Sequence, residues 1–445
     1  MKLRDAGFAW ILAVALAGLS ACGGGGGGNS TAPVPVTVSP PVASIAAVTD
    51  FDLGTGVKLD GRQSTVAAGK TATYQWEITK RPGGSEAALT EAATATPGFT
   101  PDVSGAYAMR LVVSDGATQS TAATASFTVR VPRQANVWQA AASALPASGN
   151  YIYVEGDAND YIIGGRSYLY TDKDALLKFS SGAASVDVRV DGDENWAGNF
   201  VLPAAKARLE PGVYTNLTRW PFNAPAVGGL SWSGEGRGCN VLTGWIAVDY
   251  VHYTGNVLDM LDMRFEQHCE GGASAMRGQM HWVAKDKTSA PGPSAIPADL
   301  WQPLAGSTPS SGTYVYLQSS LGDYIGGGKT YTYTPATSPD LRIDVSGNTL
   351  KVNVGGWTSD FVGMQNLTQL AEGYYPGVQR FPFHNPIKGG MNWSGNGRGC
   401  NTLTGWFAID KLTFVTGNLV ALDARFEQHC EGGSSALRGK IHYER

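Results

Sequence analysis

Two runs of charged and histidine side chains are the segments of this sequence best suited to chemistry. Each run alternates apolar residues with an aspartate, an arginine, a glutamate and a histidine. These are Asp262, Arg264, Glu266 and His268 in the first run and Asp423, Arg425, Glu427 and His429 in the second. Arginine and glutamate form several directed hydrogen bonds, and histidine can change its charge near neutral pH. This chemistry suits either ligand binding or a network of ion pairs.

A return segment follows each run after a glycine-containing turn. Its polar residues are Arg277, Gln279 and His281 in the first copy and Arg438, Lys440 and His442 in the second. Alternation with period two predicts an antiparallel hairpin with one face in the core and one polar face. We expect Cys269 to lie opposite Met276. His268 would then face Arg277 across the polar face.

The polar face of this hairpin has two interpretations. It can be a solvated face whose opposite charges pair across strands, each pair contributing a few tenths of a kcal/mol. It can also be a binding site in which arginine and glutamate form hydrogen bonds and histidine is a tunable partner. Both copies keep these residues although large stretches elsewhere differ between them. The sequence leaves both interpretations open.

A glycine-rich loop precedes the first cysteine of each copy. Residues 234–238 read Gly-Glu-Gly-Arg-Gly, and residues 395–399 read Gly-Asn-Gly-Arg-Gly. Close glycines permit unusual backbone angles near a disulfide. The functional alternative is a loop that presents Arg237 and Arg398 to an anionic or sugar ligand. Upstream, residues 219–222 and 380–383 can add aromatic side chains to a rim, although packing is the usual role of such residues.

The five cysteines are Cys22, Cys239, Cys269, Cys400 and Cys430. In an exported protein an odd count leaves one thiol to explain, and apart from Cys22 each copy contains one pair of cysteines. An oxidising compartment favours Cys239–Cys269 and Cys400–Cys430 disulfides. Each would contribute about 3 kcal/mol through the unfolded chain. A metal site that combines a cysteine with His268 is a weaker alternative, because adjacent strand residues point to opposite faces.

Catalysis has little support in the sequence. No G-x-S-x-G or H-E-x-x-H motif occurs, and the copies share no Ser-His-Asp arrangement, so no catalytic residue is predicted. Asp249, Asp262 and Glu266 can supply a carboxylate pair for glycoside cleavage. His268 and His281 with Glu266 can bind a metal. Neither alternative is favoured, and no metal or cofactor is predicted.

The first 22 residues are typical of an export signal. A short basic start precedes an apolar run, and Leu19-Ser20-Ala21-Cys22 resembles the lipobox of bacterial lipoproteins. The resemblance implies removal of residues 1–21 and lipidation of Cys22. Residues 22–41 are rich in glycine and proline and suit a tether. By the same resemblance, glycine after the cysteine indicates the outer membrane of a Gram-negative cell envelope.

Residues 42–131 are predicted to form a small β-sandwich. Short apolar alternations are separated by turn residues, as in Tyr74-Gln75-Trp76 and residues 105–116. Their order and spacing resemble the PKD family of immunoglobulin-like domains, which implies a spacer or adhesive module. That family sometimes binds calcium through acidic loop residues such as Asp60 and Asp115, so calcium is a lesser alternative here.

Residues 136–285 and 299–445 are predicted to be two copies of one all-β domain, joined by a linker at 286–298. Tyr-x-Tyr strands and glycine turns recur in both and predict a sandwich or barrel. Their GRGCN and FEQHCEGG segments are similar to segments of uncharacterised bacterial surface proteins. A net charge of −4 without a basic cluster argues against nucleic acid as a partner.

We therefore expect a lipid-anchored cell-surface protein that binds an extracellular partner, either a glycan or a protein. The alternatives are a hydrolase acting on polysaccharide and a structural envelope lipoprotein. Two weak sites on one tether gain avidity, which favours binding over catalysis. A carbohydrate site would place exposed aromatic residues beside the polar face of the hairpin. A hydrolase would place two carboxylates about 5–10 Å apart in a cleft.

Overall fold

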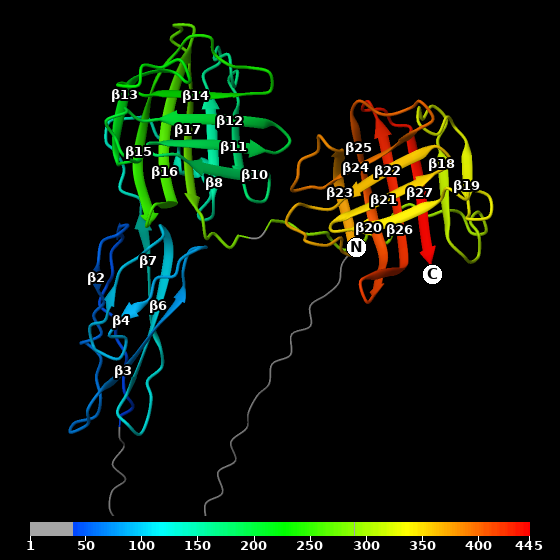
Figure 1. The fold of residues 1–445 in the computed structure, drawn as a ribbon. Coiled ribbons are helices and arrows are strands. Elements are labelled where there is room, and N and C mark those ends of the chain that lie inside the picture. The colour runs from blue at the N-terminus through cyan, green and yellow to red at the C-terminus, as the bar shows by residue number, and fades with distance from the viewer. Residues whose placement is uncertain (1–38, 289) are drawn as a thin grey trace, which may run out of the picture.

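The computed structural model describes residues 39–288 and 290–445, and these form three β domains that follow one another along the chain (Figure 1). The helical content of these residues is a single 3-10 turn, η1 Ala142–Ala144, and none of their helices is long and apolar enough to cross a membrane. The predicted all-β class is confirmed. The predicted signal, the lipidation site Cys22 and most of the tether lie outside the described residues.

The N-terminal domain is a small sandwich of two sheets, ordered β1-β7-β6-β3 and β2-β5-β4. Its strands are β1 Phe51–Asp52, β2 Val57–Lys58, β3 Thr73–Lys80, β4 Leu89–Thr90, β5 Gly98–Phe99, β6 Gly105–Ser114 and β7 Ala123–Arg130. Trp76 lies in the core, as its place in an alternating strand predicts. Asp60 pairs with Arg62, and Asp115 accepts bonds from the backbone of Ala117 and Thr118. Both carboxylates thus hold local turns.

Each repeat domain is one ten-stranded sheet that folds over on itself. The first contains β8 Tyr151–Gly156, β9 Ser167–Thr171, β10 Leu176–Ser181, β11 Ser185–Asp191, β12 Asn195–Val201, β13 Gly212–Arg219, β14 Gly229–Gly234, β15 Leu242–Thr254, β16 Val257–Cys269 and β17 Ala275–Val283. The strand order is β10-β11-β12-β14-β13-β15-β16-β17-β8-β9. In Figure 1, β11 and β12 cross the long strands β15 and β16, so the sheet makes two layers.

The second repeat domain has the same strand order. Its strands are β18 Tyr314–Ser319, β19 Thr330–Tyr333, β20 Arg342–Ser346, β21 Thr349–Val354, β22 Trp357–Val362, β23 Gly373–Arg380, β24 Gly390–Gly395, β25 Leu403–Val415, β26 Asn418–Cys430 and β27 Ala436–Glu444. The sheet begins at β19 and ends at β20, which correspond to β9 and β10. The two copies therefore share topology as well as motifs.

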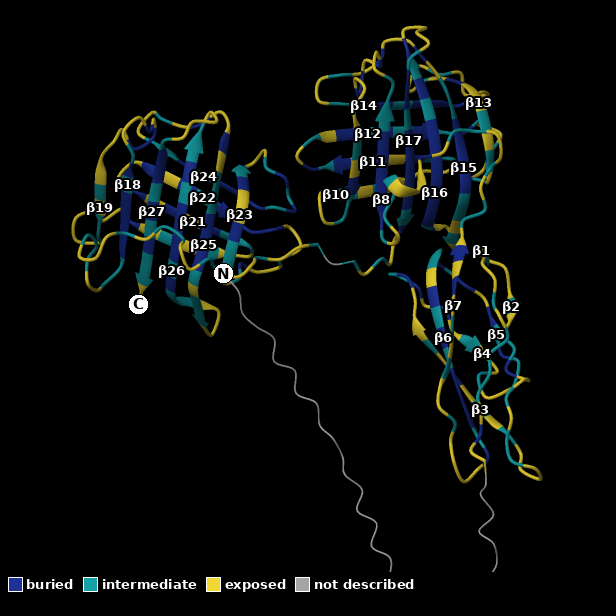
Figure 2. Ribbon diagram, turned by 180° about the vertical axis from the view of Figure 1, so that it is seen from behind, coloured by how far each residue is buried: buried dark blue, intermediate teal, exposed yellow. Residues whose placement is uncertain are grey.

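The core of each repeat domain lies between its two layers, where buried strand segments face one another (Figure 2). Phe265 of β16 contacts Phe200 of β12, with ring centroids 4.8 Å apart. A side chain at Gly278 would collide with the Phe265 ring, so glycine lets this ring lie flat against β17. Gln267 is fully buried, and its amide bonds the backbone of Trp232 in the opposite layer. These contacts fix how the layers stack.

Both expected disulfides are present. Cys239–Cys269 and Cys400–Cys430 each join the loop before a long strand to the end of its neighbour. Cys269 lies on the inner face with Gln267, as the alternation predicts. The bond therefore closes the core at one end of each repeat domain. Next to it, Gly236 and Gly397 adopt positive φ angles of 73° and 74°, which the glycine-rich loops were expected to permit.

Candidate functional site

The hairpin at the candidate site forms with a different register from the expected one. Gln267, not Cys269, pairs with Met276, and His268 pairs with Ala275. The turn starts directly after Cys269, where Glu270 has a φ of 55° and its carboxylate accepts the backbone N–H of Asn240. Cys269 thus has no partner on the return strand. The faces were predicted correctly, but the pairing was wrong by two residues.

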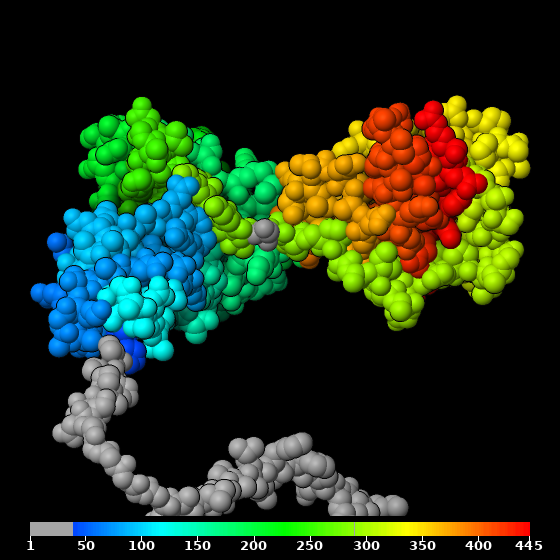
Figure 3. All heavy atoms as spheres, turned by 90° about the horizontal axis from the view of Figure 1, so that it is seen from below, coloured from blue at the N-terminus to red at the C-terminus, as the bar shows by residue number. Residues whose placement is uncertain are grey.

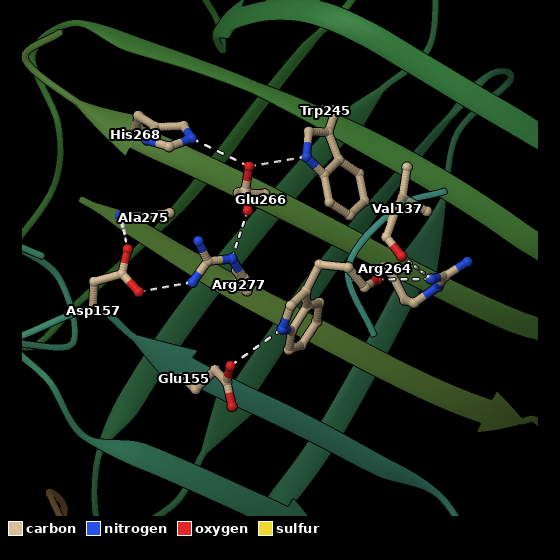
Figure 4. Close-up of polar contacts among 10 residues, drawn as sticks. Val137, Glu155, Asp157, Trp245, Arg264, Glu266, His268, Ala275 and Arg277 are labelled. Atoms are coloured by element: carbon tan, nitrogen blue, oxygen red, sulfur yellow. Dashed lines mark hydrogen bonds and ion pairs between the residues drawn. The ribbon is translucent and has the colours of Figure 1, made fainter. Parts of the chain in front are cut away.

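With this register, one row of polar and aromatic side chains crosses the outer face of the first repeat domain. The row runs across β15, β16, β17 and β8 and consists of Trp245, Glu266, Arg277 and Glu155. We call it the outer row. Three of its members are linked directly (Figure 4): the indole N–H of Trp245 donates to Glu266 over 3.1 Å, and Arg277 Nε donates to the other oxygen of Glu266 over 2.5 Å. The row is therefore preorganised.

Three more side chains border the outer row. Asp157 accepts from Arg277 Nη1 over 2.8 Å, and this contact lowers the pKa of Asp157. Trp138 donates its indole N–H to Glu155. His268 Nε2 lies 3.2 Å from Glu266. Half-buried tryptophans therefore stand at two borders of a charged strip, with a histidine and an aspartate at its end.

The second repeat domain repeats the outer row with two changes. Its row is Trp406, Glu427, Arg438 and Gln318. Glu427 bonds both Arg438 and His429. Burial alone would raise the pKa of Glu427, but these two partners outweigh it and lower the pKa. Gln318 stands in place of Glu155, and Ser320 takes the place of Asp157 beside the arginine. The second row is therefore less acidic than the first.

Arg264 and Arg425 were candidate binding residues, but the structure buries them. Arg264 is 1% exposed, and all five of its N–H groups are used. They bond both oxygens of Asp249 and the carbonyl oxygens of Gln134, Val137 and Trp138. Arg425 is also buried and forms four of the corresponding bonds, two to Asp410 and one each to the carbonyl oxygens of Leu300 and Trp301. Both arginines therefore hold the chain segment that leads into the first strand of each repeat domain, which we call the entering segment. They fix it on the outer face of the sheet instead of facing a ligand.

His281 and His442 also lie away from the outer row. His281 is buried, bonds Asp262 over 2.8 Å and stacks on Tyr151. Burial alone would lower the pKa of His281, but the Asp262 carboxylate outweighs it and raises the pKa. The pair lines a cavity of about 580 Å³ at the junction with the N-terminal domain. His442 bonds Asp423 in the same way in the second copy.

Arg237 and Arg398 lie over tryptophan rings rather than reaching freely into solvent. The guanidinium of Arg237 is 5.4 Å from the ring centre of Trp196, and that of Arg398 is 5.1 Å from Trp357. A side chain at Gly327 would touch the Arg398 guanidinium. The glycine-rich loop therefore approaches the turn between β18 and β19. Both arginines stay partly exposed, so they can still contact a ligand.

The carboxylates proposed for catalysis are already engaged. Asp249 is bound to Arg264, Asp262 to His281, and Glu266 to Arg277 and Trp245. Within residues 39–288 and 290–445, no group of three or more histidine, cysteine or acidic side chains is placed to hold a metal ion.

Sequence reasoning missed the aromatic part of the site. Trp138 and Trp301 begin the repeat domains, Trp245 and Trp406 lie in apolar strand segments, and none of the four was among the predicted site residues. Phe222 and Phe383 belong to segments that were expected either to pack or to add aromatic side chains to a rim, and they are 75% and 73% exposed. Tyr161 and Tyr324 are also exposed in both copies. Recurrence at matching positions of both copies was the signal that could have revealed them.

Comparison with known proteins identifies one part of the chain. Residues 49–131 match a family model that is described as a PKD domain. The first domain is a PKD domain. This confirms the predicted family of that unit, and the match does not extend into the two repeat domains.

Other comparisons add no argument about function. No curated protein matches the chain. The solved structures that match include that of a nucleoside hydrolase-related hypothetical protein from Saccharophagus degradans that is associated with carbohydrate metabolism. It is 15% identical, the similarity covers 21% of this chain and 26% of that chain, and the TM-score is 0.18. A score this low supports neither a shared fold nor a shared activity.

Proposed function

We propose that this chain is an extracellular binding protein that recognises glycans through the outer rows of its two repeat domains. The PKD domain would act as a spacer, and lipid on Cys22 would hold the chain at the outer membrane of the cell envelope. The observation that carries the proposal is the outer row itself. Both copies place a tryptophan, a glutamate and an arginine in register across three strands, and in each copy the arginine is bonded to the glutamate.

The chemistry of the outer row suits a sugar. Sugar hydroxyls both donate and accept hydrogen bonds, and guanidinium and carboxylate groups side by side offer donors and acceptors at fixed positions. The faces of sugar rings carry C–H groups, which pack on an indole such as Trp245. Because Glu266 and Arg277 already hold each other, little side-chain freedom is lost on binding. A carbohydrate site was expected to place exposed aromatic residues beside the polar face, and the tryptophans that stand there, Trp138 and Trp245, are half-buried.

The duplication supports binding as well. Two rows on one chain can engage a polymeric ligand together, and the second contact then becomes intramolecular. A glycan with repeating units presents the same epitope many times. Weak affinity at each row is therefore compatible with firm attachment. The difference between Glu155 and Gln318 suggests that the two rows prefer related but not identical sugars.

A glycan array would test this proposal on the chain from Asn29 to Arg445. We expect the double variant Trp245→Ala/Trp406→Ala to lose about tenfold or more in binding, because the apolar platform for the sugar is removed. Arg277→Gln/Arg438→Gln should lose binding too. Arg189→Gln/Lys351→Gln is the matched control, since both residues are exposed on the other layer, and it should bind like the parent chain.

The outcomes separate the possibilities. Specific binding that the row variants abolish and the control keeps supports the proposal. Binding that survives in both row variants places the glycan site elsewhere. If no glycan binds to a folded, disulfide-bonded sample, the proposed ligand class is wrong and a protein partner becomes the better hypothesis.

A further inference from the structure

The contact between the two repeat domains is centred on one aspartate of the first copy. Asp193, in the turn between β11 and β12, accepts hydrogen bonds from Gln379, Asn385 and Lys388 of the second copy. Asn385 is fully buried and also donates to the carbonyl oxygen of Asp174 over 2.8 Å. Figure 3 shows the two domains in contact beside the linker. A buried amide with two partners in the other domain indicates a defined contact.

The residues of this contact are those in which the two copies differ. The first copy has Asp191-Gly192-Asp193-Glu194-Asn195 in this turn, where the second copy has only Gly355-Gly356. In the loop after β13, Ala224 and Val227 stand where the second copy has Asn385 and Lys388. The first copy thus carries the acceptor and the second copy carries the donors. Divergence of the copies has built an interface that neither copy could make with itself.

A groove of about 630 Å³ lies at this contact and is lined by both copies. The first copy contributes Asp191 and Asn195, and the second contributes Asn348, Gln365, Phe383 and His384 among others. Arg380 lies 5.2 Å from the ring centre of Phe383 and covers one face of the ring. The ring is nevertheless 73% exposed. Phe383 is therefore a supported aromatic platform at the edge of the groove.

The polar lining of the groove is mostly neutral. The side-chain amides of Asn195 and Gln365 are exposed, and neither forms a hydrogen bond within the part of the chain that the structure describes. Nδ1 of His384 is buried and has no partner among the same residues. Burial lowers the pKa of His384, so this ring is neutral at neutral pH. Among the described residues of the lining, Asp191 carries the one charge, and Lys178 already pairs with it over 2.7 Å.

We propose that this groove between the repeat domains is a second glycan site, for a neutral oligosaccharide. Amides offer a donor and an acceptor side by side, which matches the hydroxyl pairs of sugars. The open face of Phe383 suits the C–H face of a sugar ring. Because the charge of Asp191 is already paired and the described lining contributes no cation, the groove favours an uncharged ligand. This proposal rests on the glycan class proposed above but uses a different surface from the outer rows.

The chain provides a close internal control for the test. Phe222 occupies the matching position of the first copy, is 75% exposed and has Arg219 stacked on it at 5.1 Å. It does not line the groove. A general effect of removing an exposed phenylalanine would therefore appear equally in Phe222→Ala and Phe383→Ala. The two phenylalanines differ in that Phe383 lines the groove and Phe222 does not.

The experiment measures the binding of neutral oligosaccharides of about four to six units to the chain from Asn29 to Arg445, by array and then by calorimetry. We expect Phe383→Ala to weaken binding by about tenfold and Phe222→Ala to change it less than about twofold. Asp193→Ala should weaken binding as much as Phe383→Ala, because it loosens the contact that assembles the groove. Arg277→Gln/Arg438→Gln should leave this binding in place.

Three other results would contradict the proposed glycan site in the groove. Equal losses in the two phenylalanine variants would mean that each aromatic loop acts alone. Loss only in the Arg277→Gln/Arg438→Gln variant would place the glycan on the outer rows and leave the groove without a ligand. If no neutral oligosaccharide binds while the outer rows bind charged glycans, the groove proposal fails and the proposed function stands.

Discussion

At the scale of single residues, the same side-chain type has opposite roles a few positions apart. Arg264 and Arg277 lie on adjacent strands of one outer face, yet one is buried with all its donors used and the other remains partly exposed. The difference comes from the entering segment, whose carbonyl oxygens at Gln134 and Trp138 cover Arg264. Which arginine is available is decided by residues more than 120 positions away in the chain.

We predict that Arg264→Met strongly destabilises the first repeat domain. It would leave the buried carboxylate of Asp249 without its partner, and such a loss costs about 3–5 kcal/mol. Urea unfolding followed by tryptophan fluorescence would measure it. Arg189→Met, an exposed change, should shift stability by less than about 0.5 kcal/mol. Equal stability of the two variants would contradict the structural role of Arg264.

A second prediction at this scale concerns Asp172 and pH. Burial raises the pKa of Asp172 to about 6, with a further contribution from Asp286. The folded state therefore disfavours the carboxylate, and this penalty is fully present above the raised pKa and disappears as the pH falls below the unfolded pKa. Asp172→Asn should stabilise the domain by roughly 1–3 kcal/mol at pH 8 and by almost nothing at pH 3. Urea unfolding at both pH values would measure the difference in stability between Asp172→Asn and the parent chain. A difference that is the same at pH 8 and pH 3 would contradict the raised pKa of Asp172.

At the scale of elements, alternation along β16 and β17 correctly predicts which side chains face the core. Phe265, Gln267 and Met280 are all buried between the layers. The pairing of the two strands was wrong by two residues, since it depends on where the turn starts, and Glu270 sets that through its bond to Asn240. The sequence also did not predict that part of the outer face is covered by the entering segment. Alternation along a strand shows which face a side chain lies on, but not whether another chain segment packs over that face.

Removal of one disulfide tests how much that bond stabilises its own repeat domain and whether the two repeat domains unfold independently. Cys239→Ser/Cys269→Ser should lower the stability of the first repeat domain by about 3 kcal/mol, because the unfolded chain gains the freedom of a closed loop of 30 residues. Thermal unfolding by calorimetry would show the shift in one transition only. Cys400→Ser/Cys430→Ser should shift the other repeat domain instead. A shift of both transitions by one change would mean that the two repeat domains unfold as a single unit.

At the scale of the whole molecule, the arrangement of the repeat domains decides how the outer rows are presented. A linker without contacts to either domain would leave their relative orientation to the linker's own flexibility. Here Ser294 instead pairs with Tyr374 of β23, so part of the predicted linker belongs to the second repeat domain. Asp193 then joins the first copy to the loop after β23. Two attachments leave far less freedom than a tether would.

Loss of the Asp193 contact should therefore change the shape of the molecule without unfolding any domain. We expect Asp193→Ala to broaden the distance distribution between spin labels placed on exposed β11 and β20, because Asn385 loses one of its two partners in the first copy and Lys388 loses its ion pair. Asp187→Ala is the control, because Asp187 is exposed on β11 and its carboxylate bonds Asn199 of the first copy, and this variant should keep the narrow distribution. An equally broad distribution in the parent chain would show that the copies move independently, and avidity toward a polymer would then depend on linker length instead of a fixed spacing between the rows.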